Sequence, residues 1–270
     1  MPAVPPILPC EAGEGDHAQR GGGGIRLMLA AAPTTAMVLA AGLGKRMRPV
    51  TDTIPKPLVR IAGRPLLDWG LDALAAAGVV KAVVNVHYLP DQIVEHVAGR
   101  TVPKIVISDE RDGLLDSAGG IVKALPELGD APFFVLNADT FWIDRGRSNL
   151  ERLALEWDDA RMDILIMLAE LESATGHSGG TDFLVAADGR LSRAQGSPEG
   201  VIYAGAAIVH PRIFAGAAPE PHSLNRYFDR AIAVGRLFGM TMAGHWITVG
   251  TPDAIPRAEE AVRRETRQER

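Results

Sequence analysis

A glycine-rich turn followed by basic residues is the part of this sequence best suited to chemistry. Residues 41–49 read AGLGKRMRP, and residues 54–58 read IPKPL. Glycines in such a turn let backbone N–H groups approach a phosphate closely and form a nest for an anion, and Arg46 and Lys56 add fixed positive charge. The segment matches neither the dinucleotide-binding nor the P-loop pattern. It indicates a triphosphate site, although a GxG after a strand can also be an ordinary turn.

A second candidate is Asp139, which directly follows the apolar run FFVLNA at residues 133–138. A carboxylate at the end of a buried strand can hold Mg²⁺ between the oxygens of a triphosphate. The same position also suits a helix cap or a turn residue. Asn137, two residues earlier, lies on the same face of the strand and is a candidate for binding a ligand through its amide, with a turn-side amide as the alternative.

Strand and helix patterns alternate through the first half of the chain. We expect strands at residues 36–41, 79–86, 104–108 and 133–137, and helices at residues 65–77, 91–98 and 117–125. This alternation predicts a mainly parallel sheet covered on both faces. Ligands of such sheets bind beyond the carboxyl ends of the strands, so the loops that follow the four strands should meet at one edge.

The alternation weakens in the second half, which indicates an insertion or a mixed sheet. Further strands are expected at residues 164–169, 181–185, 191–194, 201–209, 237–242 and 245–249, and helices at residues 223–234 and from 252 onward. We therefore predict one α/β domain over residues 34–270. Residues 1–33 lack apolar periodicity and are expected to be a disordered tail, and Met28 or Met37 is an alternative start.

The composition excludes several classes of protein. Of the 270 residues, 47% are hydrophobic and 23% are charged, which is typical of a soluble globular protein. No apolar run is long enough to cross a membrane, and a net charge of −5 without a long basic run argues against nucleic acid as a partner. A lone cysteine, Cys10, and the lack of a signal-peptide pattern favour the cytoplasm. The oligomeric state stays open.

Residues 40–59, AAGLGKRMRPVTDTIPKPLV, resemble the signature of the sugar-1-phosphate nucleotidyltransferase family, G-x-G-x-R-[LM]-x-P-x-T followed by P-K-P-L. The likeness extends over about residues 35–265. It implies a Rossmann-like α/β fold with a mainly parallel, mixed central sheet. It also implies a reaction in which a sugar phosphate oxygen attacks the α-phosphorus of a nucleoside triphosphate and expels pyrophosphate. Positioning and charge neutralisation supply most of the catalysis in such transfers.

The resemblance also implies roles for individual residues. Arg46 would neutralise the departing pyrophosphate, Lys56 would bridge the α-phosphate and the sugar phosphate, and Asp139 would hold Mg²⁺. The expected nucleotide-binding residues are Ala41, Gly42, Gly44, Lys45, Arg46, Lys56, Ser117, Gly119 and Gly120, although the last three also suit a plain helix cap. The expected sugar-binding residues are Asn137, Asp182, Tyr203 and Gly205.

Within the family, residues 119–139 resemble the branch that transfers uridylyl groups to N-acetylmuramate 1-phosphate, and this pair of substrates is expected. Mannose 1-phosphate with GTP is the alternative. One position departs from the family pattern: residues 246–251 read WITVGT where W-x-D-x-G-T is common, so Thr248 replaces a metal-binding carboxylate. Either Mg²⁺ arrives on the triphosphate and Asp139 suffices, or the protein is a non-catalytic sugar-nucleotide sensor. The presence of Arg46, Lys56 and Asp139 favours the enzyme.

Overall fold

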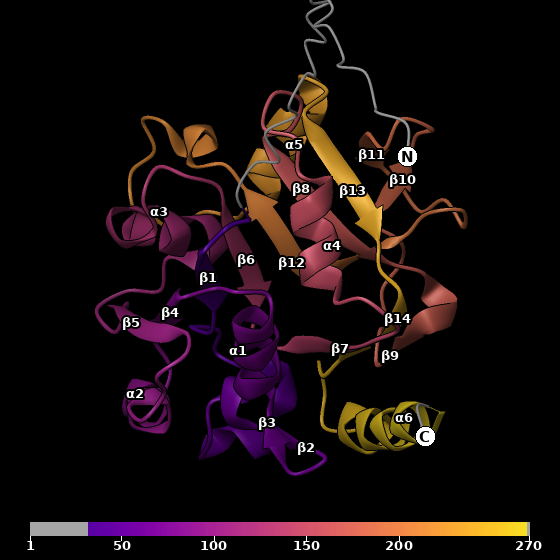
Figure 1. Cartoon of the computed structure of the whole chain (residues 1–270). Helices are drawn as coiled ribbons and strands as arrows, with labels where there is room; N and C mark the ends of the chain where they lie inside the picture. Colours follow the sequence, from indigo (N-terminus) through magenta and orange to yellow (C-terminus); the bar gives the residue numbers. More distant parts are fainter. Residues whose placement is uncertain (1–31, 269–270) are drawn as a thin grey trace, which may run out of the picture.

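The computed structural model describes residues 32–268, and its centre is a seven-stranded sheet (Figure 1). The strands lie in the order β13-β8-β12-β6-β1-β4-β5, so that β13 and β5 form opposite edges. All neighbouring pairs are parallel except those of β12, which is antiparallel to both β6 and β8. The bounds are β1 (Thr35–Leu39), β4 (Lys81–Val86), β5 (Lys104–Asp109), β6 (Phe133–Asn137), β8 (Ile164–Ala169), β12 (Ile202–Val209) and β13 (Leu237–Thr241).

Helices cover both faces of this sheet because successive strand residues point to opposite sides. In β1, Ala36 and Val38 belong to one core and Met37 to the other. The first core contains α1 (Leu66–Ala76), α2 (Pro90–Val97) and α4 (Asn149–Glu156). The second core contains α3 (Asp116–Leu128) and α5 (Asn225–Ala233). The strands are apolar almost throughout, as strands covered on both faces must be.

A small three-stranded sheet stands beside the main one and is covered by α6 (Ala254–Gln268), drawn in yellow in Figure 1. Its strands are β7 (Thr140–Asp144), β14 (Gly244–Thr248) and β9 (Ala174–Thr175). A third apolar core joins Phe141, Ile247 and Ala258 to Met47 of the glycine-rich segment. The small sheet therefore packs against the segment that carries the expected triphosphate site and stabilises it.

Two hairpins and five short 3-10 helices complete the described structure. The hairpins pair β2 (Arg60–Ile61) with β3 (Arg64–Pro65) and β10 (Phe183–Val185) with β11 (Leu191–Arg193). The 3-10 helices are η1 (Lys45–Met47), η2 (Val50–Asp52), η3 (Lys56–Leu58), η4 (Leu171–Ser173) and η5 (Pro211–Phe214). None of the helices in residues 32–268 is long and apolar enough to cross a membrane.

The predicted fold class, a Rossmann-like α/β structure with a mainly parallel, mixed sheet, is confirmed. The helix α4, the strands β2, β3, β7 and β9, and the five 3-10 helices were not predicted. Only a two-residue turn, Ala138 and Asp139, separates β7 from β6, and α4 is a short amphipathic helix in a stretch for which no element is predicted. The disordered tail predicted for residues 1–33 lies outside the described residues except for its last two, of which Pro33 is buried.

Candidate active site

A cavity of about 490 Å³ lies at the carboxyl ends of β1, β4 and β6. The loops that follow these strands meet there, as expected for a sheet of this kind. Six of the residues singled out in the sequence line it: Ala41, Gly42, Lys56, Ser117, Asn137 and Asp139. Gly44, Lys45, Arg46, Gly119, Gly120 and Gly205 are not among the lining residues. The cavity therefore joins candidates from three distant parts of the chain.

An ion pair between Lys56 and Asp139 is the main electrostatic feature of this cavity. Lys56 begins η3 and is buried, and its Nζ lies 2.6 Å from Oδ2 of Asp139. The Lys56 side chain is 11% exposed and that of Asp139 is 38% exposed, so the carboxylate is the more accessible partner. An ammonium has three N–H donors, so Lys56 keeps donors for an incoming phosphate. Oδ1 of Asp139 makes no hydrogen bond within residues 32–268.

The glycine-rich loop is held in shape by side chains behind it. Gly44 has a φ of +61°, a conformation that favours glycine, and a Cβ there would lie 3.0 Å from Cγ2 of Thr51. The buried Thr51 hydroxyl donates to the Gly44 carbonyl at 2.8 Å, and the Tyr88 hydroxyl donates to the Thr51 carbonyl at 2.8 Å. These bonds fix the loop while Lys45 and Arg46 on η1 stay exposed. Both basic side chains can therefore meet a ligand above the loop.

A buried hydrogen-bonded chain links the loop after β1 to the segment that begins α3. Asn85 Oδ1 accepts from the Ala40 N–H at 2.7 Å, and Asn85 Nδ2 donates to Glu110 Oε1 at 2.8 Å. The other oxygen of Glu110 accepts from the Leu115 N–H at 3.0 Å, and Glu110 is 1% exposed. Sequence reasoning missed Glu110 as a positioning residue. The available signal was a carboxylate two residues after the strand predicted at 104–108.

The two glycines of α3 lie where backbone and polar groups come very close. A Cβ on Gly119 would collide with the Glu220 carbonyl oxygen, and one on Gly120 would lie 2.7 Å from Glu110 Oε1. Ser117 accepts a hydrogen bond from the Leu224 N–H at 2.8 Å through its Oγ. The glycines thus allow α3 to pack closely against its neighbours. The Ser117 side chain links α3 to the start of α5 by a hydrogen bond.

Three of the four expected sugar-binding residues line a second cavity of about 220 Å³. Asn137, Asp182 and Tyr203 line it, and Asp182 Oδ2 accepts from the Tyr203 N–H at 2.9 Å. The Tyr203 hydroxyl is shielded from solvent and has no hydrogen-bond partner in the described part of the chain. Burial, and then the charge of Asp139, raise the pKa of Tyr203, so this hydroxyl stays protonated and can donate. Gly205, with a φ of +77°, packs against Asn137 instead.

Thr248, the last residue of β14, is close to Asp139 through the backbone pairing of β14 with β7. Thr248 is in register with Thr140, and the Val249 N–H donates to the Asp139 carbonyl at 3.2 Å. No group of three or more His, Cys, Asp or Glu side chains within residues 32–268 could hold a metal. The accessible Asp139 carboxylate nevertheless fits a hard cation that takes its other ligands from nucleotide phosphates and water.

Comparisons with known proteins agree with this fold. The family model of the MobA-like NTP transferase domain matches residues 36–204. The chain is 43% identical over 233 residues to N-acetylmuramate alpha-1-phosphate uridylyltransferase of Caulobacter vibrioides, covering 84% of this chain and 96% of that protein. It is 32% identical over 228 residues to the enzyme of the same name from Neisseria meningitidis, covering 83% and 96%.

More distantly related proteins are also similar to this chain. A probable mannose-1-phosphate guanylyltransferase of Arabidopsis thaliana is 28% identical over 231 residues, covering 80% of this chain and 62% of that protein. The structure of the inositol-1-phosphate CTP transferase from T. maritima matches with a TM-score of 0.69 at 18% identity, over 87% of this chain and 97% of that one. The chain belongs to the sugar-1-phosphate nucleotidyltransferase family. Members of this family generally use a divalent metal.

Proposed function

We propose that this protein transfers the uridylyl group of UTP to N-acetylmuramate 1-phosphate, giving UDP-N-acetylmuramate and pyrophosphate. The observation that carries the proposal is the 43% identity to the uridylyltransferase from C. vibrioides over 96% of that protein. The Lys56–Asp139 pair at the carboxyl ends of the parallel strands supports it, because nucleotidyl transfer needs a cation and a metal-binding carboxylate at one place. We place this activity in residues 34–270 and in the cytoplasm.

In the proposed reaction, a phosphate oxygen of the sugar phosphate attacks the α-phosphorus of UTP. A new P–O bond forms, the bond from the α-phosphorus to the bridging oxygen breaks, and that oxygen leaves with pyrophosphate. Lys56, buried at the cavity wall, would hold the α-phosphate and the attacking phosphate together. Exposed Arg46, together with Lys45 and the backbone of Gly44, would neutralise the departing pyrophosphate. Both effects stabilise charge that develops in the transition state.

Asp139 would hold the Mg²⁺ ion through a carboxylate oxygen, and the ion would neutralise charge on the triphosphate when bound. Ala41, Gly42 and Ser117, which line the first cavity, would bind the nucleotide, whereas Gly119 and Gly120 face neighbouring protein groups. Asn137 and Asp182 would contact the sugar, and Gly205 would act only through its packing against Asn137. The protonated Tyr203 hydroxyl would donate a hydrogen bond to a sugar oxygen, since it lacks a partner among the described residues.

A matrix of substrates tests the proposal. Pyrophosphate release is measured with UTP, GTP, CTP and ATP, each combined with N-acetylmuramate 1-phosphate, mannose 1-phosphate or no sugar phosphate. We expect release with UTP and N-acetylmuramate 1-phosphate to exceed every other combination. Faster release with GTP and mannose 1-phosphate would assign the guanylyltransferase activity. No release in any combination, with nucleotide still bound, would assign a sugar-nucleotide sensor.

A further inference from the structure

The second cavity adjoins the first. Leu39, Ser117 and Asn137 line both cavities, so one molecule can extend from the Lys56–Asp139 pair into the smaller space. A volume of about 220 Å³ has room for several heavy atoms. The phosphate of the sugar substrate belongs with Lys56 in the first cavity, and the second cavity is left for the part of the sugar that lies farthest from that phosphate.

Arg193, the last residue of β11, brings a positive charge to this second cavity. Asp182 is the acidic residue among those that line it, and one of its carboxylate oxygens already accepts from the Tyr203 N–H. The rest of the wall is neutral, with Phe183 and Phe228 as apolar surfaces. Neutral sugar hydroxyls do not require a fixed cation, whereas an anionic group in so enclosed a place does.

The guanidinium of Arg193 is fixed before any ligand arrives. Its Nε donates to Asp229 Oδ1 at 2.8 Å, its Nη2 donates to Asn225 Oδ1 at 3.0 Å, and its Cζ lies 4.8 Å from the centroid of the Phe183 ring. Its Nη1 makes no hydrogen bond to any of residues 32–268. Asp229 is 62% exposed, so water screens its attraction for Arg193. Arg193 thus offers the two N–H groups of Nη1 to a carboxylate at low cost in side-chain entropy.

We propose that Arg193 binds the carboxylate of an acidic sugar 1-phosphate and sets the specificity of the enzyme for it. N-acetylmuramate carries a lactyl ether that ends in a carboxylate, and neither N-acetylglucosamine nor mannose has such a group. This inference rests on the proposed function, and it names the side chain that recognises the feature by which the two proposed sugar substrates differ.

Two sugar phosphates and two matched variants test this specificity. The value of kcat/KM with UTP is measured for N-acetylmuramate 1-phosphate in the wild type, Arg193→Gln and Arg190→Gln. Arg190 precedes the same strand, and its guanidinium binds Asp188 and the Gly235 carbonyl outside the cavity. N-acetylglucosamine 1-phosphate, which lacks the lactyl group, is measured alongside as a substrate or as a competitive inhibitor.

We expect Arg193→Gln to lower kcat/KM for N-acetylmuramate 1-phosphate by roughly 10- to 100-fold, mainly through KM, because a hydrogen bond to a charged group is lost. The constant for N-acetylglucosamine 1-phosphate should stay within about twofold, and Arg190→Gln should leave both constants within the same limit. Equal losses for both sugars, or no loss for either, would overturn the role of Arg193 and leave the proposed function standing. A wild type that is inactive on N-acetylmuramate 1-phosphate would overturn both.

Discussion

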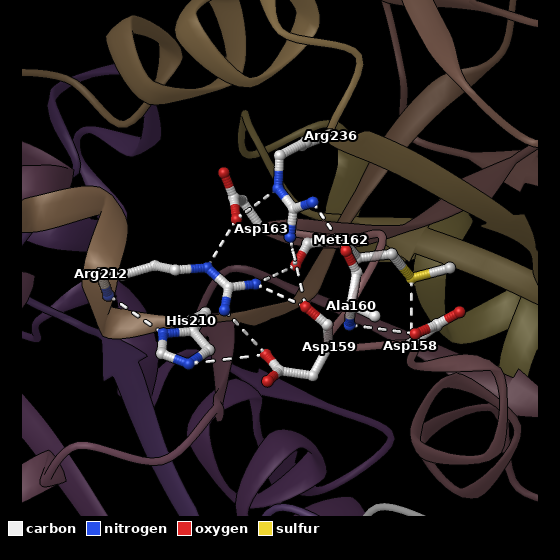
Figure 2. Close-up of polar contacts among 8 residues, drawn as sticks. All are labelled: Asp158, Asp159, Ala160, Met162, Asp163, His210, Arg212 and Arg236. Carbon is white, nitrogen blue, oxygen red and sulfur yellow. Dashed lines mark hydrogen bonds and ion pairs between the residues drawn. The ribbon is translucent and has the colours of Figure 1, made fainter.

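The polar groups at the two ends of the central sheet differ in how many of them have partners within the protein. At the carboxyl edge, where the parallel strands end, Lys56 and Asp139 form one ion pair beside a cavity, and the Tyr203 hydroxyl has no partner among the described residues. The amino edge is where β8 and β13 begin and the antiparallel β12 ends. Charged groups there form ion pairs with one another and hydrogen bonds to backbone carbonyls. Figure 2 shows this second cluster.

Asp163, just before β8, is the centre of the amino-edge cluster. Its Oδ1 accepts from Arg212 Nε at 2.7 Å and from Arg236 Nε at 2.8 Å, and both guanidiniums also donate to backbone carbonyls of the segment 159–162 (Figure 2). Burial alone would raise the pKa of Asp163, but the hydrogen bonds and charges of Arg236 and Arg212 outweigh it and hold the pKa below its usual value. The Asp163 carboxylate therefore stays ionised and stabilises the fold.

This contrast distinguishes groups that stabilise the fold from groups that are available to bind a ligand. Buried polar groups normally have partners, and the amino-edge cluster follows that rule. Groups without partners concentrate at functional sites, because a ligand supplies the missing contacts. We therefore expect substitutions at the two edges to affect different measurements.

The largest effect is expected for Lys56→Ala. Removing a preorganised charged donor costs on the order of 10² to 10³ in rate. We expect kcat to fall by roughly that factor while KM for UTP changes much less, because Lys56 acts where the two phosphates react. Steady-state pyrophosphate release measures both constants, and Lys81→Ala, which removes the half-buried partner of the exposed Glu127, is the control. A folded Lys56→Ala protein with wild-type turnover would rule out this role.

The next largest effect should be on stability alone. Arg236→Ala removes hydrogen bonds from the Asp163 carboxylate and from carbonyls of the neighbouring segment, and we expect the free energy of unfolding to drop by about 1–3 kcal/mol. Urea unfolding measures this change. Arg263→Ala, which loses an exposed pair with Glu260 on α6, should change it by less than about 0.5 kcal/mol. The contrast between the edges fails if Arg236→Ala lowers kcat at a temperature where the variant is fully folded.

A smaller effect is expected for Thr248→Asp, which places a second carboxylate beside Asp139. Mg²⁺ prefers hard, negatively charged oxygen ligands. The Mg²⁺ concentration that gives half-maximal rate should fall in this variant, and Mg²⁺ should bind without nucleotide more tightly than to the wild type. A Mg²⁺ titration of pyrophosphate release and calorimetry with Mg²⁺ alone measure the two changes, with Thr248→Ser as the control. If only the variant releases pyrophosphate, Thr248 marks a lost activity and the protein is a sensor.

The smallest effect concerns pH and His210. Burial, and then the charge of Arg212, lower the pKa of His210, while Asp159 opposes this shift. A histidine whose pKa is lower in the folded state takes up more protons in the unfolded state, so the protein should lose stability as the pH falls below about 6.5. His210→Gln should flatten the dependence of the unfolding free energy on pH between about 5 and 7. An unchanged slope would show that other groups, such as His245, set it.

The sequence predicted the fold and the main cavity better than it predicted the supporting contacts. Lys56 and Asp139 could be placed together because a family signature and a strand end fall at known points of a parallel sheet. Glu110 could not, because its partners Asn85 and Leu115 come from two other segments that meet only in the folded chain. Arg193 was missed for the same reason: nothing near β11 in the sequence shows that it lines the second cavity.

A competition experiment tests the central claim most directly. The wild type is given equal concentrations of UTP and GTP together with equal concentrations of N-acetylmuramate 1-phosphate and mannose 1-phosphate, and the sugar nucleotides formed are identified by mass spectrometry. Asp139→Asn, which keeps the shape of the side chain but removes its charge, serves as the blank. We predict UDP-N-acetylmuramate as the main product in the wild type and little product in the variant. GDP-mannose as the main product, or equal amounts of product from both proteins, would contradict the proposed function of this site.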